Sequence, residues 1–381
     1  MPGDLTAALN LGLYVHVPFC ARRCEFCAFY EEAPLRRDID RYLACVAREL
    51  AGLNLPHRAD TVFWGGGTPS LLPPRDLERL AAATLEAAHG RPDEWTVEMT
   101  PVTARPDRLR VLKEAGVTRV SIGVQSFNEE ILHALGRIHT ACQVYEAIDA
   151  VRAAGFDNLN LDMMFALPGQ SLAEWEGDLA RAVAAGPEHI STYCLSFEED
   201  TPLWLRLQRG RTTKRGADEE ALFYERTWEV LGAAGLAQYE VSNFARSGRE
   251  CAHNVNTWRM QEWAGVGPSA ASQIGLRRFA NVSSLADWAA GVESGVPARK
   301  DETELDANLL AEDSVLFGLR MTRGVDLDQL RARFPFHDWE TVAAIARNLA
   351  LEGLAEFDGR QVRLTPRGRL VTDQVALAFM E

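Results

Sequence analysis

Residues 14–30 read Tyr-Val-His-Val-Pro-Phe-Cys-Ala-Arg-Arg-Cys-Glu-Phe-Cys-Ala-Phe-Tyr, and this stretch decides the fold. An apolar run leads into a loop that carries Cys20, Cys24 and Cys27, three of the seven cysteines of the chain. The spacing C-x3-C-x2-C lets one loop present three thiolates to one iron–sulfur centre. A [4Fe-4S] cluster held by three cysteines keeps one iron open for another ligand. The stretch therefore predicts a cluster with an open iron.

Zinc is the alternative metal for the same three thiols. Structural zinc needs four ligands, and no Cys or His lies close behind Cys27. The fourth ligand would then come from His16 or from a distant residue. This alternative stays open here, and the motifs described below favour the cluster.

Strand and helix patterns alternate from the amino terminus to about residue 200. Apolar runs that predict strands occur at residues 11–17, 59–64, 94–99, 119–124, 158–163 and 189–195, and a helical pattern follows each. Six such units in succession predict parallel strands with right-handed crossovers, hence an open or partial barrel. The motifs fall at the carboxyl ends of these strands, where α/β barrels place their chemistry.

The rest of the chain departs from this alternation. A helical pattern at 217–234 precedes a segment, 238–275, that is rich in Gly, Asn and aromatic residues and indicates a cap. From about residue 301, helical patterns precede a short hairpin with a turn at Asp358-Gly359, as in a winged helix. We therefore predict an α/β fold with a partial barrel at 1–200, a cap at 201–300 and a winged-helix-like domain at 301–381.

The charge of the chain narrows the class of partner. A formal net charge of −14 argues against general affinity for nucleic acid or anionic membranes. No run approaches the ~18 apolar residues of a membrane span, and residues 1–13 lack the pattern of a leader peptide. Together with scattered further cysteines, these features predict a cytoplasmic protein with reduced thiols. A DNA-binding winged helix is the alternative to a packing or docking role, because the last part contains Arg331, Arg333, Arg360, Arg363, Arg367 and Arg369.

Four motifs resemble those of one family. They are Tyr-Val-His-Val-Pro-Phe-Cys (14–20), Trp-Gly-Gly-Gly-Thr-Pro-Ser (64–70), Ser-Ile-Gly-Val-Gln-Ser-Phe (121–127) and Ala-Leu-Pro-Gly-Gln-Ser (166–171). With Phe26 before the last cysteine, they resemble the radical S-adenosylmethionine (SAM) superfamily, in the branch of oxygen-independent coproporphyrinogen III dehydrogenase and the heme chaperone HemW. The resemblance covers nearly the whole chain. It implies that the open iron binds the methionyl group of SAM and that Phe26 lies near the adenine.

The resemblance also assigns residues to the SAM site. Gly66, Gly67 and Thr68 follow the second strand and correspond to the segment that binds the methionyl end, although a tight turn is the alternative. Each remaining candidate, taken alone, would be an ordinary capping, solvated or core residue, and their joint occurrence supports the assignment. The remaining candidates, which match family positions that contact SAM, are Tyr14, Glu98, Gln125, Arg137 and Asp162.

A last motif concerns heme. Residues 251–258, Cys-Ala-His-Asn-Val-Asn-Thr-Trp, resemble the H-N-x-x-Y-W motif of the heme-chaperone branch, with Thr257 in place of the tyrosine. The resemblance implies heme ligation by His253, since imidazole is a common axial ligand. A hydrogen-bonded structural histidine is the alternative, and Cys251 is a candidate second ligand.

Two features favour the chaperone over the dehydrogenase of porphyrin biosynthesis. The dehydrogenase branch has a further cysteine two positions after the third, where this chain has Phe29, and a longer segment before the first strand. We expect a protein that uses a [4Fe-4S] cluster, SAM and heme and transfers heme to an acceptor protein. A flavodoxin or ferredoxin is the expected electron donor, with no nucleic-acid partner and no integral membrane segment. The dehydrogenase and a related radical SAM methyltransferase remain the alternatives.

Overall fold

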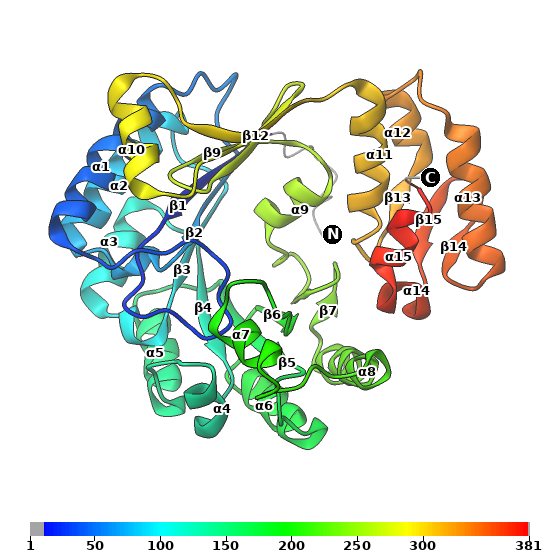
Figure 1. The fold of residues 1–381 in the computed structure, drawn as a ribbon, viewed down its shortest axis with the longest axis horizontal. Coiled ribbons are helices and arrows are strands. Elements are labelled where there is room, and N and C mark those ends of the chain that lie inside the picture. The colour runs from blue at the N-terminus through cyan, green and yellow to red at the C-terminus, as the bar shows by residue number, and fades with distance from the viewer. Residues whose placement is uncertain (1–10, 380–381) are drawn as a thin grey trace.

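A computed structural model describes residues 11–379, and these residues are organised around one large sheet. Its twelve described strands follow the order β12-β11-β10-β9-β1-β2-β3-β4-β5-β6-β8-β7. The first six strands pair in parallel and in chain order, which confirms the predicted partial barrel (Figure 1). They are β1 (Leu11–Val17), β2 (Thr61–Gly66), β3 (Glu94–Met99), β4 (Arg119–Gln125), β5 (Leu159–Phe165) and β6 (His189–Cys194).

Helices cover the outer face of this curved sheet, as the crossovers between parallel strands require (Figure 1). The first of them buries one stripe at helical spacing: Ile39, Leu43, Val46 and Leu50 are buried and the opposite face is charged. The helices of this part of the chain are α1 (Arg36–Ala51), α2 (Pro74–Ala87), α3 (Pro106–Ala115), α4 (Glu129–Ala134), α5 (Ala141–Ala153), α6 (Leu172–Ala184), α7 (Pro202–Gln208) and α8 (Ala217–Ala233). The short α7 lies instead beside the loop after β1, where the Leu203 N–H donates to Glu25 O at 2.8 Å.

The predicted cap region adds strands to both edges of the sheet. On one side β9 pairs in parallel with β1, and on the other β8 pairs antiparallel with β6. The predicted boundaries at residues 200 and 300 stay predictions. The elements of this region are β7 (Ala237–Gln238), β8 (Asn243–Ala245), α9 (Ala252–Trp258), β9 (Glu262–Val266), β10 (Ala271–Ile274), β11 (Arg277–Asn281), α10 (Leu285–Ser294) and β12 (Arg299–Glu304).

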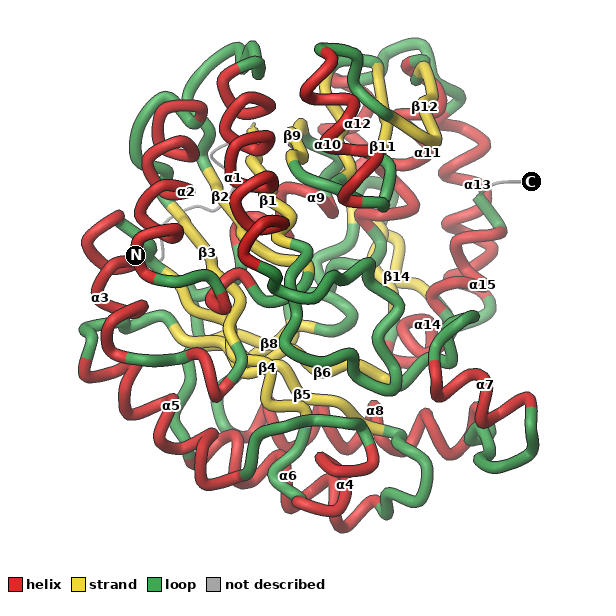
Figure 2. The backbone as a smooth tube through the Cα atoms, turned by 60° about the vertical axis from the view of Figure 1, so that its left-hand side comes forward, coloured by secondary structure: helices red, strands yellow, loops and turns green. Residues whose placement is uncertain are grey.

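The C-terminal domain has its own hydrophobic core and a three-stranded antiparallel sheet. The backbone of this domain lies on the right of the view in Figure 2. Helices followed by a hairpin confirm the winged-helix-like prediction, and the Thr365 side chain caps the helix after the hairpin by accepting from the Gly368 N–H. The elements are α11 (Ala307–Gly318), β13 (Val325–Asp326), α12 (Leu327–Arg333), α13 (Trp339–Leu351), β14 (Ala355–Phe357), β15 (Gln361–Leu364), α14 (Pro366–Leu370) and α15 (Thr372–Leu377).

The arginines of this domain are largely engaged within the protein. Arg360 pairs with Asp326, and Arg363 pairs with Glu356. Arg333 donates to the carbonyl oxygen of Met260 at 2.8 Å. These contacts support the packing role over the DNA-binding alternative.

None of the helices in residues 11–379 has the length and apolarity needed to cross a bilayer. The prediction that the chain begins without a leader peptide falls largely on residues 1–10, which lie outside the described residues.

Candidate functional site

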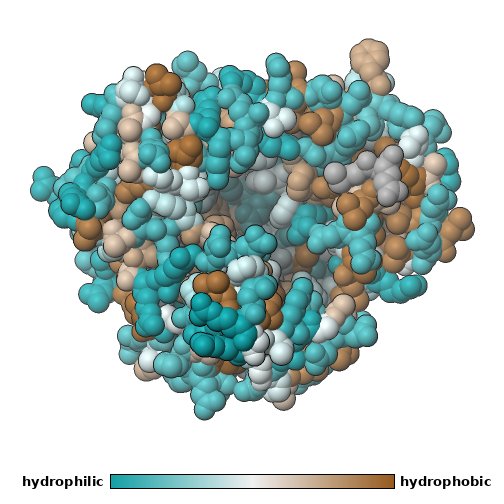
Figure 3. Space-filling model, in the orientation of Figure 1, coloured by the Kyte–Doolittle hydropathy of each residue, from teal (hydrophilic) through white to brown (hydrophobic). Residues whose placement is uncertain are grey.

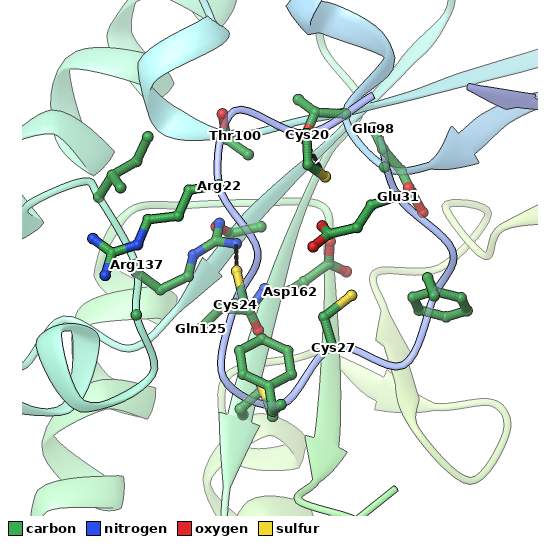
Figure 4. Close-up of a pocket in the computed structure, with 18 of the residues that line it drawn as sticks. Cys20, Arg22, Cys24, Cys27, Glu31, Glu98, Thr100, Gln125, Arg137 and Asp162 are labelled. Atoms are coloured by element: carbon green, nitrogen blue, oxygen red, sulfur yellow. Dashed lines mark hydrogen bonds between the residues drawn. The ribbon is translucent and has the colours of Figure 1, made fainter. Parts of the chain in front are cut away.

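The three cysteines lie on the loop that connects β1 to α1, above the carboxyl ends of the barrel strands. Hydrogen bonds hold this loop at both sides: the Cys20 N–H donates to Glu32 O at 3.1 Å, and the Glu25 N–H donates to Leu135 O at 3.0 Å. The cysteines line a pocket of about 690 Å³ (Figure 4). We call it the cysteine pocket.

Iron–sulfur coordination suits these thiols. Burial raises the pKa of Cys20 to about 12 and that of Cys27 to about 11, so a bound metal centre must supply the positive charge that deprotonates them. Arg137 Nη1 donates to Cys24 Sγ at 3.3 Å (Figure 4).

The glycines after β2 let this segment lie against the cysteine loop. A Cβ on Gly66, which has φ 105°, would lie 2.6 Å from the His16 ring, and a Cβ on Gly67 would lie 2.7 Å from Phe19 O. The Thr68 N–H donates to Phe19 O at 2.8 Å, and its hydroxyl lies 3.7 Å from Cys20 Sγ. All three residues line the cysteine pocket, but the contacts that require glycine are with the protein itself.

Two carboxylates project into the cysteine pocket from β3 and β5. Burial, and then the nearby charge of Asp162, raises the pKa of Glu98 to about 8, while the Gly66 N–H donates to Glu98 Oε2 at 3.2 Å. Asp162 accepts from Ser121 Oγ at 2.9 Å and from Asn160 Nδ2 at 2.7 Å, and burial raises its pKa. Both can accept hydrogen bonds from amino or hydroxyl groups of a ligand.

Gln125 and Arg137 complete the predicted set on this side. Gln125 has φ 70°, and the register shifts beside it at the end of β4. Such strained non-glycine backbone concentrates at functional sites. Arg137 Nη2 donates to Gly123 O at 2.6 Å, which directs its guanidinium over the strand end toward Cys24. Phe26 lines the pocket and also packs against the small core around Leu135, so its two predicted roles are compatible.

The cysteine pocket thus contains every residue predicted for the SAM site except Tyr14. Sequence reasoning missed several of its other lining residues. Tyr193 and Cys194 could have been predicted, because they are the last two residues of β6 and side chains at the carboxyl ends of these strands line the pocket. The loop residues show no sequence pattern that would have indicated them. The missed residues include Arg22, Glu31, Thr100, Tyr193, Cys194 and Glu198. Figure 4 labels the first three of them.

Tyr14 lies in a second pocket, of about 330 Å³, which we call the histidine pocket. Its lining is mainly aromatic and includes Tyr14, His16, Phe29, Phe63, His253 and Trp263. The Tyr14 hydroxyl lies 3.0 Å from His16 Nδ1, and its ring centroid lies 6.2 Å from that of Phe63. The space-filling view shows a hollow near the middle of the face that Figure 1 presents (Figure 3).

His253 has the state and orientation of a metal-binding imidazole. Its Nδ1 lies 2.9 Å from Thr61 Oγ1, and its ring centroid lies 5.3 Å from that of Phe63. Gly12 leaves room for the ring, since a Cβ there would lie 3.0 Å from His253 Cε1. Burial lowers the pKa of His253 to about 4, so the imidazole is neutral near pH 7.

A buried carboxylate from β3 sets the position of α9. Glu94 accepts from the N–H groups of Ala252 at 3.0 Å and His253 at 3.1 Å, and from Cys251 Sγ at 3.5 Å. Cys251 is fully buried and does not line the histidine pocket, which argues against it as a second ligand.

The far end of α9 contacts the C-terminal domain. Trp258 stacks on Phe317 of α11 with ring centroids 6.2 Å apart. The Arg320 guanidinium lies over the Trp258 ring, 4.9 Å from its centroid. Figure 1 accordingly shows α9 between the barrel and α11. Thr257 lines the histidine pocket beside His253. The motif at 251–258 is therefore shared between the pocket and the domain contact.

A buried polar chain runs through the barrel interior from Asp162 in the cysteine pocket to the start of α9. Asp162 bonds to Asn160 (2.7 Å), Asn160 to His189 (2.6 Å), and His189 to the Tyr239 hydroxyl (2.8 Å). That hydroxyl accepts from the Cys251 N–H at 3.2 Å, at the start of α9. No sequence pattern indicated this chain.

Comparisons with known proteins agree with this geometry. The family model described as the radical SAM superfamily matches residues 14–182, and the HemN C-terminal domain matches residues 305–371. The chain is 33% identical to the heme chaperone HemW of Bacillus subtilis, covering 96% of this chain and 98% of that protein. It is 36% identical to the protein of the same name from Mycobacterium tuberculosis, covering 100% and 96%. The solved structure of coproporphyrinogen III oxidase (HemN) from Escherichia coli matches with a TM-score of 0.83, at 23% identity, over 98% of this chain and 91% of that one, which shows the shared fold.

Proposed function

The chain belongs to the HemW family of the radical SAM superfamily, and from this premise we propose that it is a heme chaperone, which binds heme and passes it to an acceptor protein. The relatives named as heme chaperones align over nearly their whole length, so the proposal covers the whole chain.

Membership in the radical SAM superfamily implies a [4Fe-4S] cluster and SAM, and the cysteine pocket suits both. Cys20, Cys24 and Cys27 would hold the cluster, which when bound supplies one-electron chemistry. We propose that a flavodoxin or ferredoxin provides the electron and that the protein works in the cytoplasm. The SAM-binding residues in this proposal are Gly66, Gly67, Thr68, Glu98, Gln125, Arg137 and Asp162; Tyr14, also predicted for this site, lines the histidine pocket instead.

One observation carries heme binding: a neutral His253 lines an aromatic pocket with its Nδ1 2.9 Å from Thr61 Oγ1, which leaves Nε2 as the nitrogen for a ligand. A second-shell hydrogen bond on one imidazole nitrogen is the usual arrangement when the other nitrogen binds a metal. The apolar rings of Tyr14, Phe63 and Trp263 supply surface for a flat macrocycle. The histidine pocket is open to the outside, which suits a protein that must release its ligand.

The test is a heme titration of anaerobically reconstituted protein. We expect the wild type to give a Soret band that His253→Ala loses or shifts. His57→Ala is the matched control, because His57 is an exposed surface histidine far along the chain from α9. Thr257→Tyr is expected to strengthen binding, since a phenol beside His253 adds a stacking face and a hydrogen bond. An unchanged spectrum in His253→Ala would refute the ligand assignment.

The same preparation separates the chaperone from the enzyme alternatives. We expect no decarboxylation of coproporphyrinogen III, because Phe29 stands where the dehydrogenase branch has its further cysteine. Product analysis for protoporphyrinogen IX and for 5′-deoxyadenosine checks this directly. Robust formation of protoporphyrinogen IX would move the protein into the dehydrogenase class.

A further inference from the structure

Phe29 is an exposed aromatic residue in an unusual place. It lies two residues after Cys27, and 68% of its surface is exposed. Its ring belongs to none of the hydrophobic clusters found in residues 11–379. An exposed phenylalanine keeps apolar surface in contact with water, which is unfavourable, and it adds nothing to the hydrophobic core. Its position therefore calls for an explanation beyond packing.

The same side chain lines both pockets. It is part of the wall of the cysteine pocket and of the wall of the histidine pocket. On the histidine side it shares the lining with His253, Phe63 and Trp263. Phe29 is thus the part of the cysteine loop that a ligand bound at His253 would meet.

We propose that Phe29 covers heme bound at His253 and, through the loop that it shares with Cys27, couples heme occupancy to the stability of the [4Fe-4S] cluster. This inference rests on the proposed function and deepens it by naming how the two sites are linked. A heme on His253 would bury the Phe29 ring, and burial of an aromatic side chain slows ligand dissociation by roughly 10-fold or more. In turn, the covered ring restrains the loop and screens the cysteine pocket from solvent.

The loop makes the second half of the link. Phe29 lies two residues after Cys27, and both residues line the cysteine pocket. A ligand that fixes the Phe29 side chain therefore restrains the chain next to a cluster ligand.

The experiment measures heme dissociation and iron loss in the reconstituted full chain. Hemin-loaded protein is mixed with excess apomyoglobin, and the rate of heme transfer is followed. We expect Phe29→Ala to release heme roughly 10-fold faster than the wild type, with Phe29→Leu between them. Phe336→Ala is the matched control, because Phe336 is a loop phenylalanine that is 96% exposed in the C-terminal domain, and its rate should equal that of the wild type.

The coupling is read separately, as the rate at which a chelator removes iron from the cluster with and without hemin. We expect hemin to slow iron loss in the wild type and in Phe336→Ala, but not in Phe29→Ala. This inference alone would be overturned if Phe29→Ala and the wild type release heme at equal rates and show equal protection of the cluster against iron loss, while His253→Ala still loses heme. If the wild type fails to bind heme, both the inference and the proposed function fail.

Discussion

Replacing Glu94 by alanine should destabilise the protein more than any other single carboxylate change near α9. The Glu94 side chain lies at the start of β3, only 8% exposed, and accepts two backbone N–H groups and one thiol from the first turn of α9. In Glu94→Ala these donors lose their acceptor inside the protein. The nearby buried Arg119 loses a favourable charge as well.

The magnitude follows from the donors that are left unpaired. Each buried N–H without an acceptor costs about 1–3 kcal/mol, so the two amides of Ala252 and His253 together cost about 2–6 kcal/mol. Total stability is typically about 5–15 kcal/mol, so this loss is large. Glu94→Gln keeps one acceptor oxygen and should cost less than Glu94→Ala.

The assay is urea unfolding followed by tryptophan fluorescence, with Asp93→Ala as the control. Asp93 is the neighbouring carboxylate, but it forms an exposed pair with Arg58 at 2.9 Å, which is worth at most about 1 kcal/mol. Heme titration of the same variants reports on His253, which Glu94→Ala should displace and Asp93→Ala should not. Equal free energies of unfolding for Glu94→Ala and Asp93→Ala would refute the reasoning.

Three further outcomes are expected. The cluster, measured as bound iron, should be lost in each of Cys20→Ala, Cys24→Ala and Cys27→Ala. Cys45→Ala should retain it, because Cys45 is buried in α1 outside the cysteine pocket. Four bound irons in any of the first three variants would show that the ligand assignment is wrong. Gly67→Val should reduce both cluster content and SAM affinity, because its side chain would meet the loop backbone at Phe19, and Gly177→Ala, which has open space, is the control whose values should not change. The pKa of Glu98 is raised to about 8 from about 4.3 in an unfolded chain, so the folded state holds a proton that the unfolded state releases, and stability falls as pH rises between these values. Urea unfolding of cluster-free protein should show the wild type losing about 2–4 kcal/mol relative to Glu98→Gln from pH 5 to pH 8, and parallel pH profiles would contradict the assignment.

The barrel and the cysteine pocket could be predicted because local patterns determine them. The predicted first and third strands match β1 and β3 residue for residue, and α3 ends at Gly116, which has φ 106° in the left-handed region that favours glycine. Parallel strands in chain order bring their carboxyl ends together, so Glu98, Gln125 and Asp162 had to meet.

The histidine pocket could not be predicted in the same way. It depends on β9 pairing in parallel with β1, where Tyr14 lies opposite Gly265, and such a long-range register leaves no local pattern. His253 reaches Phe63 and Thr61 only through this arrangement. The sequence around Tyr14 is compatible with a place in either pocket, so only the fold shows that Tyr14 lines the histidine pocket.

The polar chain from Asp162 to the start of α9 has a single direction. Asn160 donates an amide hydrogen to Asp162, so its oxygen accepts from His189 Nδ1. Burial holds the pKa of His189 well below its usual range, so the ring is neutral and Nε2 accepts from the Tyr239 hydroxyl, which in turn accepts from the Cys251 N–H. One tautomer of His189 is thereby selected, and all four dipoles align head to tail from the start of α9 to the Asp162 carboxylate. Hydrogen bonds in such a chain polarise one another, so we expect a ligand that hydrogen-bonds to Asp162 to alter the strength of the bonds along it as far as the Cys251 N–H.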